Sequence, residues 1–329
     1  ATGRLREQLD SVNRRRYDYL TYKLKGEFSY RFSGAHAIDA NVAYMVNPPQ
    51  FRDAFVSART RNTTTPGLDS EKVLGVDLSY NLNLPWITAR VSGYYTSVAD
   101  QSKVISYYDD TQSSFTNFAM SGIDKVHFGL EAAVSIPIYH TLALNGAVSW
   151  GQYTYDSNPY YLQTQDNSGD IVSDGYVYWK DFRVESTPQT AVNVGLSWRS
   201  NNNIYLSADF NYYNNMYLSM SPIYRTDAVI TGGMAPGDIE HLRRQEKFDS
   251  AYTLNASIGK NWYIHRKYTL GFSLDVKNIL NNQDIKTGGY EQTRLSKNTE
   301  TTVTTYQAFD SKYFYMFGTT YYLNLYFRF

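Results

Sequence analysis

The sequence contains no cysteine, few prolines and no excess of charge of either sign. The absence of cysteine among its 329 residues excludes disulfide bonds, thiol nucleophiles and cysteine-ligated zinc or iron–sulfur sites. The 31 basic and 31 acidic side chains cancel, whereas nucleic-acid-binding proteins carry a clustered basic excess, so nucleic acid is not an expected partner. Nine prolines are too few for an extended disordered chain. No apolar run approaches the ~18 residues that a transmembrane helix needs.

Tyrosine is abundant, and hydrophobic residues recur with a period of two. The chain has 32 tyrosines, and 42% of its residues are hydrophobic. In 22–32, apolar residues alternate with polar ones such as Lys23 and Glu27, and the same alternation recurs in 321–329. Successive side chains on a strand face opposite ways, so each such segment has one apolar and one polar face.

The alternation predicts an all-β, antiparallel protein with about eleven strands. Between the strands, short connections such as Asn83-Leu84-Pro85 and long ones such as 156–185 follow each other in strict alternation. The long connections are expected at 47–70, 107–115, 156–185, 218–248 and 285–310. The expected strands are 17–33, 36–46, 71–82, 86–106, 116–138, 141–155, 186–199, 203–217, 249–264, 267–284 and 311–329.

This arrangement favours a transmembrane β-barrel over a soluble sandwich. Outer-membrane barrels have tight turns at the periplasmic end and long loops outside the cell, whereas a sandwich has no reason to sort its loops by length. Aromatic residues also cluster beside the short turns, where an interfacial girdle is expected: Trp86, Tyr139, Trp198, Trp262 and Tyr263. Bacterial single-chain barrels close with an even number of strands, so about eleven strands form only part of one.

Two sets of residues are candidates for contacts. The polar positions of the strands should face the barrel interior, where they line a pore or contact a plug: Lys23, Glu27, Arg31, Arg90, Glu131, Asp209, Asp275, Lys277 and Arg328. Aromatic residues and an arginine in the long loops can stack on and hydrogen-bond to a ligand: Tyr160, Tyr161, Tyr176, Tyr178, Trp179, Tyr224 and Arg225. Loop–loop packing is the alternative interpretation of this second set.

Two C-terminal segments carry a family resemblance. Leu274-Asp275-Val276-Lys277-Asn278-Ile279-Leu280-Asn281-Asn282 resembles the strand-to-loop motif near the end of TonB-dependent outer-membrane transporters, and Tyr313–Phe329 resembles their last strand, which ends in an aromatic residue. Upstream, Pro48–Arg52 and Pro66–Lys72 are similar to one of their extracellular loops, although Ser70 stands where proline is usual and Ile279 where leucine is usual.

The resemblance implies the C-terminal half of a 22-stranded barrel that is filled by a plug domain. It implies active import of a scarce nutrient across the bacterial outer membrane. The implied partners are the N-terminal barrel and plug segment of the same precursor, TonB and its inner-membrane energising complex, outer-membrane lipid and, as a further option, a surface lipoprotein. Phe327 and Phe329 correspond to the signal that the barrel-assembly machinery reads. The style of the sequence is closer to Bacteroidetes receptors with a carboxypeptidase-like regulatory domain than to the SusC-like branch.

The whole chain, 1–329, is therefore expected to be barrel, with 1–16 as an extracellular loop segment and without a plug. A passive porin and an outer-membrane barrel hydrolase are the alternatives. For a hydrolase, His241 with Asp238 or Glu240 is the only local candidate pair, and it lacks a known motif. The oxygen-rich segment Asp166–Asp170 suits calcium, but a solvated turn is favoured because the rest of an EF-hand loop is missing. We therefore expect no enzyme activity, cofactor or resident metal.

Overall fold

The computed structural model describes residues 17–57, 61–110, 112–139, 141–185, 187–231, 242, 244–265, 267–298 and 305–329. Strand residues make up 65% of the described residues and helical residues 5%, which confirms the all-β prediction. Within the described residues, no helix combines the length and the apolar character needed to cross a membrane.

A single antiparallel sheet forms the main wall of the molecule. Eleven of its thirteen strands pair in the order in which they occur in the chain, and β7 and β8 lie off this path. The eleven are β1 (Tyr22–Arg31), β2 (His36–Asn47), β3 (Glu71–Leu84), β4 (Ile87–Asp109), β5 (Ser114–Tyr139), β6 (Leu142–Tyr155), β9 (Thr190–Arg199), β10 (Ile204–Asn214), β11 (Ala251–Ile264), β12 (Tyr268–Lys277) and β17 (Thr320–Arg328).

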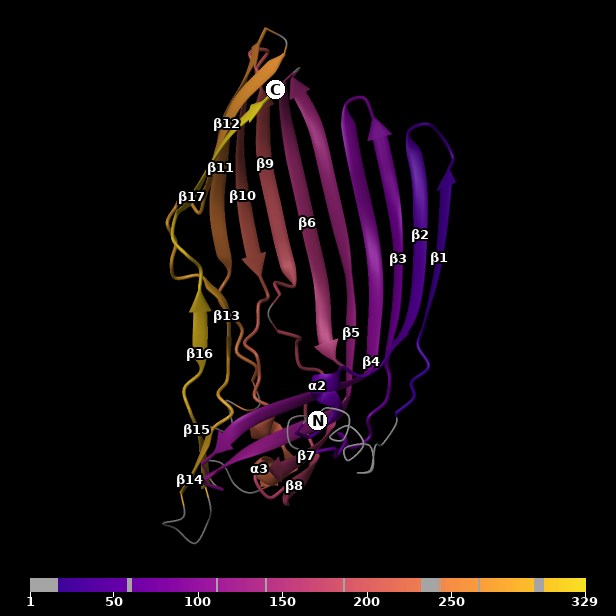
Figure 1. Cartoon of the computed structure of the whole chain (residues 1–329). Coiled ribbons are helices and arrows are strands. Elements are labelled where there is room, and N and C mark those ends of the chain that lie inside the picture. Colours follow the sequence, from indigo (N-terminus) through magenta and orange to yellow (C-terminus); the bar gives the residue numbers. More distant parts are fainter. Residues whose placement is uncertain are drawn as a thin grey trace, which may run out of the picture.

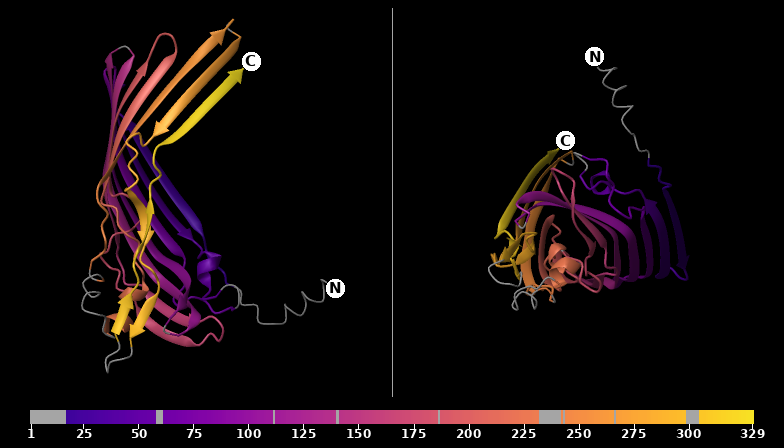
Figure 2. Two further views of the ribbon diagram at one scale, coloured as in Figure 1. Left: turned by 90° about the vertical axis from the view of Figure 1, so that its left-hand side faces the viewer. Right: turned by 90° about the horizontal axis from the view of Figure 1, so that it is seen from below.

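The wall is curved, with short turns at one end and long connections at the other (Figure 1). The short turns lie at the top of Figure 1, and the long connections gather at the bottom with the small helices and the extra strands. Seen from below, the wall is an open trough between its indigo and yellow ends (Figure 2). We call the part formed by the long connections the head.

The two faces of the wall differ as the alternation predicts. Across the first strands, Phe28, Leu78 and Leu130 lie on one face, and each has more than half of its surface exposed. Large apolar side chains exposed over a whole sheet face are what lipid contact requires. The other face carries polar pairs, among them the hydrogen bond from Asn41 Nδ2 to Asp77 Oδ1, 3.0 Å.

Exposed aromatic side chains lie beside the short turns. Trp86 is 63% exposed and Tyr139 is 70% exposed. Trp198, Trp262 and Tyr263 lie in the same zone at the ends of β9 and β11. This belt matches the interfacial girdle expected at the end of a barrel that has tight turns.

The predicted long connection 107–115 is wrong. β4 and β5 continue through it and are separated only by residues 110–113, so the two strands project beyond the wall as one long hairpin. The pairing shifts near Asp100 and Gly122, whose φ angles of 61° and 69° bend the hairpin away from the wall. Irregular backbone of this kind is not visible in the alternation of the sequence.

The other long connections contain short elements. The connection after β2 holds α2 (Phe51–Ala54), and the connection after β6 holds β7 (Tyr160–Gln165) and β8 (Ile171–Tyr176). The connection after β10 holds η1 (Ile223–Arg225) and α3 (Asp227–Thr231). The connection after β12 holds β13 (Lys286–Tyr290), β14 (Leu295–Asn298), β15 (Thr305–Ala308) and β16 (Lys312–Tyr315).

The largest overestimates of strand length concern three predicted strands, and Asn278 explains two of them. The first strand begins at Tyr22 instead of 17, β12 ends at Lys277 instead of 284, and the last predicted strand is split into β16 and β17. Asn278 is buried with φ 51°, and its Nδ2 donates to the carbonyl oxygens of Asn282 and Phe317. The asparagine of the resemblance motif therefore ends β12 and fixes the segment that leads into β17.

Candidate functional site

The concave face of the wall encloses a hollow of about 1080 Å³. Residues of β2–β6, β9 and β10 line it: charged and polar side chains such as Arg90, Glu131 and His127 alternate with alanines, valines and tyrosines. The ring of His127 stacks on Tyr153 with 4.8 Å between centroids, and the hydroxyl oxygens of Tyr153 and Tyr94 are 2.7 Å apart. A second hollow of about 670 Å³ lies nearer the short turns and is lined by Arg31 and Arg90 among others.

The strand register places the residues expected to face inward on this concave face. Glu27 lies opposite Asn41, and Asn41 lies opposite Asp77, which lines the larger hollow. Arg90 is held by its neighbours, because its Nη2 donates to Ser79 Oγ (2.9 Å) and its Nε to Ser92 Oγ (3.1 Å). Pairing and alternation put the remaining members of the set on the same face: Lys23, Arg31, Glu131, Asp209, Asp275, Lys277 and Arg328.

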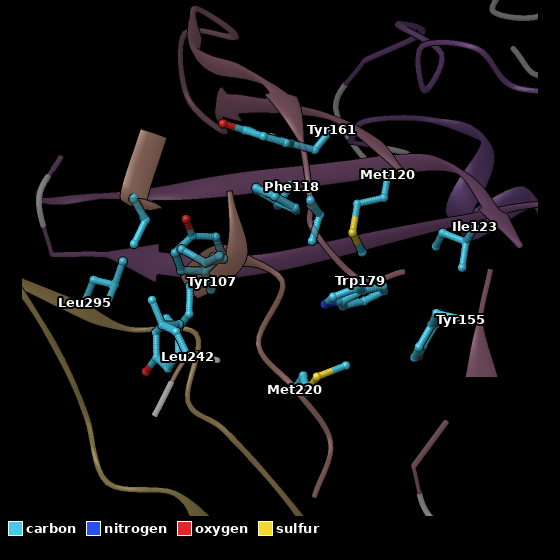
Figure 3. Close-up of a cluster of buried hydrophobic side chains, with 14 residues drawn as sticks. Tyr107, Phe118, Met120, Ile123, Tyr155, Tyr161, Trp179, Met220, Leu242 and Leu295 are labelled. Atoms are coloured by element: carbon cyan, nitrogen blue, oxygen red, sulfur yellow. The ribbon is translucent and has the colours of Figure 1, made fainter. Parts of the chain in front are cut away.

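The head has an apolar core of its own. A cluster of buried side chains joins β4, β5, β6 and β7 to the connections around 177–182, 220–229 and 295 (Figure 3). Phe118 and Tyr161 stack with their ring centroids 4.6 Å apart, and Tyr155 lies 4.7 Å from Trp179. The long connections are therefore packed together, and the wall itself has no comparable core among the described residues.

Four of the seven loop residues predicted to contact a ligand are buried in this core. Tyr161, Trp179, Tyr224 and Arg225 expose at most 3% of their surface, so a ligand at the surface does not reach them in this structure. The surroundings of these four side chains agree with the alternative interpretation, packing between loops. Sequence alternation identifies the faces of a strand but does not show which face another loop covers.

Arg225 forms a buried ion pair with Glu291, a residue that no sequence pattern singles out. Arg225 Nη1 and Nη2 donate to the two carboxylate oxygens of Glu291 at 2.5 and 2.9 Å, and each side chain is 2% exposed. The backbone N–H of Ser221 donates to the same carboxylate, and the guanidinium lies 5.3 Å from the centroid of Phe182. The pair joins the connection after β10 to the connection after β12.

The other three tyrosines remain at the surface beside two aspartates. Tyr160 donates its hydroxyl to Asp174 at 2.8 Å, and Tyr178 donates to Asp227 at 2.5 Å. Each carboxylate raises the pKa of the tyrosine that it binds, because the hydrogen bond favours the neutral phenol. The rings of Tyr160 and Tyr176 meet edge to face at 5.8 Å. The three tyrosine rings and the two carboxylates therefore form one surface, in which hydrogen bonds and ring contacts hold the side chains in position.

A polar pocket of about 470 Å³ lies where β2, β3 and β4 enter the head. Pro48, Pro49 and Arg52 of the resemblance motif line it together with Asp53 and Glu71. Glu71 accepts a hydrogen bond from Gln101, which in turn accepts one from Lys125. The resemblance segments 48–52 and 66–72 supply part of this lining, but no signal in the sequence shows that 100–104 completes the pocket.

The remaining candidates have structural neighbours or lie outside the described residues. Asp166 Oδ1 accepts from Asn117 and Ser57, so it is already occupied by protein groups. No group of metal-ligating side chains is found in the described part of the chain. Phe327 stacks on Tyr268 at 5.7 Å, and Phe329 is exposed. Residues 1–16 and the pair of His241 with Asp238 or Glu240 lie outside the described residues.

No family model matches the chain, and no curated protein matches it. Solved structures resemble its fold. The siderophore receptor PiuA from Acinetobacter baumannii has a TM-score of 0.55 at 10% identity, over 92% of this chain and 35% of that chain. The ferric yersiniabactin uptake receptor FyuA from Yersinia pestis has a TM-score of 0.52 at 13% identity, over 92% of this chain and 36% of that chain. The ferric-catecholate import receptor Fiu from E. coli K12 has a TM-score of 0.51 at 14% identity, over 92% of this chain and 34% of that chain.

The chain thus spans about a third of the length of these receptors. At such low identity, the similarity establishes the fold alone. The chain has the fold of a section of the β-barrel wall of such receptors, with the head formed by the connections at one end.

Proposed function

We propose that the chain is part of the barrel of a TonB-dependent importer in the bacterial outer membrane. The main support is the eleven-stranded antiparallel wall with an apolar convex face, a polar concave face and all long connections at one end. The structurally similar proteins are TonB-dependent receptors, and the C-terminal motifs resemble the same family.

In this function the wall performs no covalent chemistry. The convex side chains contact lipid, and the mixed charges of the concave face hydrogen-bond with a plug supplied by the rest of the precursor. The head captures a scarce nutrient, and force transmitted by TonB rearranges the plug so that the nutrient passes. We place the chain in the Bacteroidetes branch that carries a carboxypeptidase-like regulatory domain, on the style of its sequence alone.

Cysteine labelling on intact cells tests the location and orientation. This chain has no cysteine of its own, so Ile171→Cys in the head and Asn202→Cys in a short turn give unambiguous signals once any cysteine in the rest of the complete protein has been replaced by serine. We expect a membrane-impermeant maleimide to label the head position on intact cells and the turn position only after permeabilisation. Labelling of Asn202→Cys on intact cells would show that the proposed orientation is wrong.

Reconstitution separates an importer from a passive porin. The complete protein in liposomes should not admit sucrose, because a plug fills the barrel. The matched control is the same protein with the plug segment deleted, which should allow the liposomes to swell in isosmotic sucrose. Swelling with the intact protein would instead establish the porin function.

A further inference from the structure

The outer parts of β4 and β5, together with β7 and β8, form a small sheet that crosses the mouth of the wall. We call this sheet the crossbeam and define it by 103–109, 114–121, 160–165 and 171–176. β7 replaces β6 as the neighbour of β5 beyond Ser121, so the sheet continues after leaving the wall. In Figure 1 it runs across the lower end toward β14 and β15.

The bend between the wall and the crossbeam is held in place. The N–H of Asp100 donates to the side chain of Asp124, and the carboxylate of Asp100 accepts from Lys72 Nζ at 2.7 Å. Across the pair, the carbonyl of Gly122 accepts from Ser157 Oγ at 2.6 Å. Both residues with positive φ are therefore bonded to neighbouring strands or connections, which leaves little freedom for a hinge.

Both faces of β5, an inner strand of the crossbeam, are covered, whereas the outer strands β4 and β8 keep exposed side chains such as Tyr108 and Ile171. Thr116, Phe118 and Met120 alternate along β5 with Asn117 and Ala119, and none of the five exposes more than 3% of its surface. Successive side chains face opposite ways, so both faces of β5 are buried here. A sheet that moves to open and close the mouth needs at least one face that is not packed against a neighbour. β5 has no such face here.

One face packs on the core of the head, and the other packs on the connection after β2. On the core side, Phe118 and Met120 belong to the same cluster as Ile223, Tyr224 and Leu295. On the face that carries Asn117, Asp166 accepts hydrogen bonds from both Asn117 (2.9 Å) and Ser57 (3.2 Å), and Ser57 belongs to the connection after β2. The N–H of Val104 donates to Asp53 at 2.9 Å and joins the edge of β4 to the same connection.

The far end of the crossbeam is joined to the connection after β12 by an exposed ion pair. Arg294 donates from Nε and Nη2 to the two carboxylate oxygens of Asp110 at 2.9 and 2.8 Å. The arginine lowers the pKa of Asp110 through these hydrogen bonds. Solvent screens an exposed pair, so its contribution is small beside the burial of several aromatic and aliphatic side chains. The ion pair therefore sets position and does not act as a latch.

We infer that the crossbeam is a permanent brace that fixes the width of the mouth and ties the β4–β5 side of the wall to the β12–β17 side. A ligand that enters the barrel passes beside the crossbeam, because the sheet cannot swing aside without exposing its buried faces. The size limit for entry is then set by the folded head and does not depend on whether a ligand is bound.

Distance measurements between spin labels test this inference. Labels at Gln112→Cys, at the tip of the crossbeam, and Asp284→Cys, beside β12, are introduced into the complete protein in lipid. We expect one narrow distance distribution, and the same distribution when Arg294→Gln removes the ion pair. We expect Phe118→Ala, which removes a buried ring, to broaden it and add a longer distance.

The controls make each outcome decisive. Asn41→Ala removes a hydrogen bond within the wall, with Asp77, that lies outside the crossbeam and away from both labels, and it should leave the distribution unchanged. If Phe118→Ala fails to assemble, Phe118→Leu provides the milder version. A second population in the unmodified protein would show a moving lid, and one created by Arg294→Gln alone would show a latch. An unchanged distribution in both Phe118 variants would contradict packing as the force that holds the brace.

Discussion

At the residue scale, Arg225 and Glu291 allow a test of structural against ligand-binding roles. Replacing Arg225 with Met leaves a buried carboxylate without its partner, which should cost about 3–5 kcal/mol. Replacing both, as Arg225→Met with Glu291→Leu, removes the charges together and should restore most of the loss. The measurement is the midpoint of thermal unfolding of the complete protein. A double variant as unstable as the single one would contradict the assignment of the pair as a packing element.

Gly129 is a second residue with a strict requirement. A side chain there would meet the carbonyl oxygen of Trp150 at 2.5 Å and the hydroxyl of Tyr94 at 2.6 Å. We expect Gly129→Ala to cost about 1–3 kcal/mol, because both neighbours must shift. Gly75→Ala is the control, since its nearest neighbour would be 3.9 Å away. Thermal unfolding of both variants checks the difference, and equal stability would show that the Tyr94 arrangement is not fixed.

The sequence predicts the facing of single residues better than their burial. The period of two puts Glu27, Arg31 and Arg90 on a polar face, and the register agrees. It does not show that Tyr161 and Arg225 are buried while Tyr178 is exposed. Burial in the head depends on which connections meet, and these connections are distant in the sequence.

At the element scale, a substitution of Gly122 in the bend tests the cost of a positive φ angle alone, because no neighbouring atom crowds the added side chain. Gly122 has φ 69°, and no atom lies within 4 Å of the position that a Cβ atom would occupy, while Gly34 has the same open surroundings without a positive φ. Gly122→Ala should therefore cost about 1–2 kcal/mol, whereas Gly34→Ala should be nearly neutral. Comparing surface abundance and thermal unfolding of the two variants measures the cost of the bend, and equal values would remove the strain argument.

β17 tests the assignment of the two faces of the wall. Leu325 is 70% exposed on the convex face, and Asn324 lies on the concave face opposite Ser273. Leu325→Arg should cost roughly 2–4 kcal/mol if the residue lies near the bilayer midplane, and Asn324→Arg should be far milder. Surface abundance in the native host measures both. Equal damage from the two substitutions would mean that the inside and outside faces are assigned wrongly.

The existence of the strands is predictable because each strand repeats one apolar and one polar face over many residues. The full length of the β4–β5 hairpin is not, because the polar run 109–114 is typical of a connection and β5 buries both of its faces at 116–120, although the two strands stay paired as far as Asp109 and Ser114. The break between β16 and β17 is equally hidden, because it depends on the hydrogen bond from Asn278 Nδ2 to the carbonyl oxygen of Phe317, which is distant in the sequence.

At the scale of the whole molecule, apolar surface is arranged in two opposite ways. The wall exposes its large apolar side chains on the convex face, and the head buries its own among the connections. This division fits a protein with lipid around its wall and water around its head. It also explains why mean hydropathy is negative in a chain that has a continuous apolar face: the alternate residues are polar and line the hollow.

The two ends of the wall lead to the last prediction. In the described part of the chain, β1 pairs only with β2, and β17 pairs only with β12. An unpaired backbone edge costs several kcal/mol per group in hydrocarbon, so we expect both edges to pair with strands of the same precursor. In the complete protein in lipid, amide exchange in Tyr22–Arg31 and Thr320–Arg328 should be as slow as in β3, which has neighbours on both sides. Fast exchange confined to alternate residues of β1 and β17 would show that both edges stay open, and the barrel assignment would then be wrong.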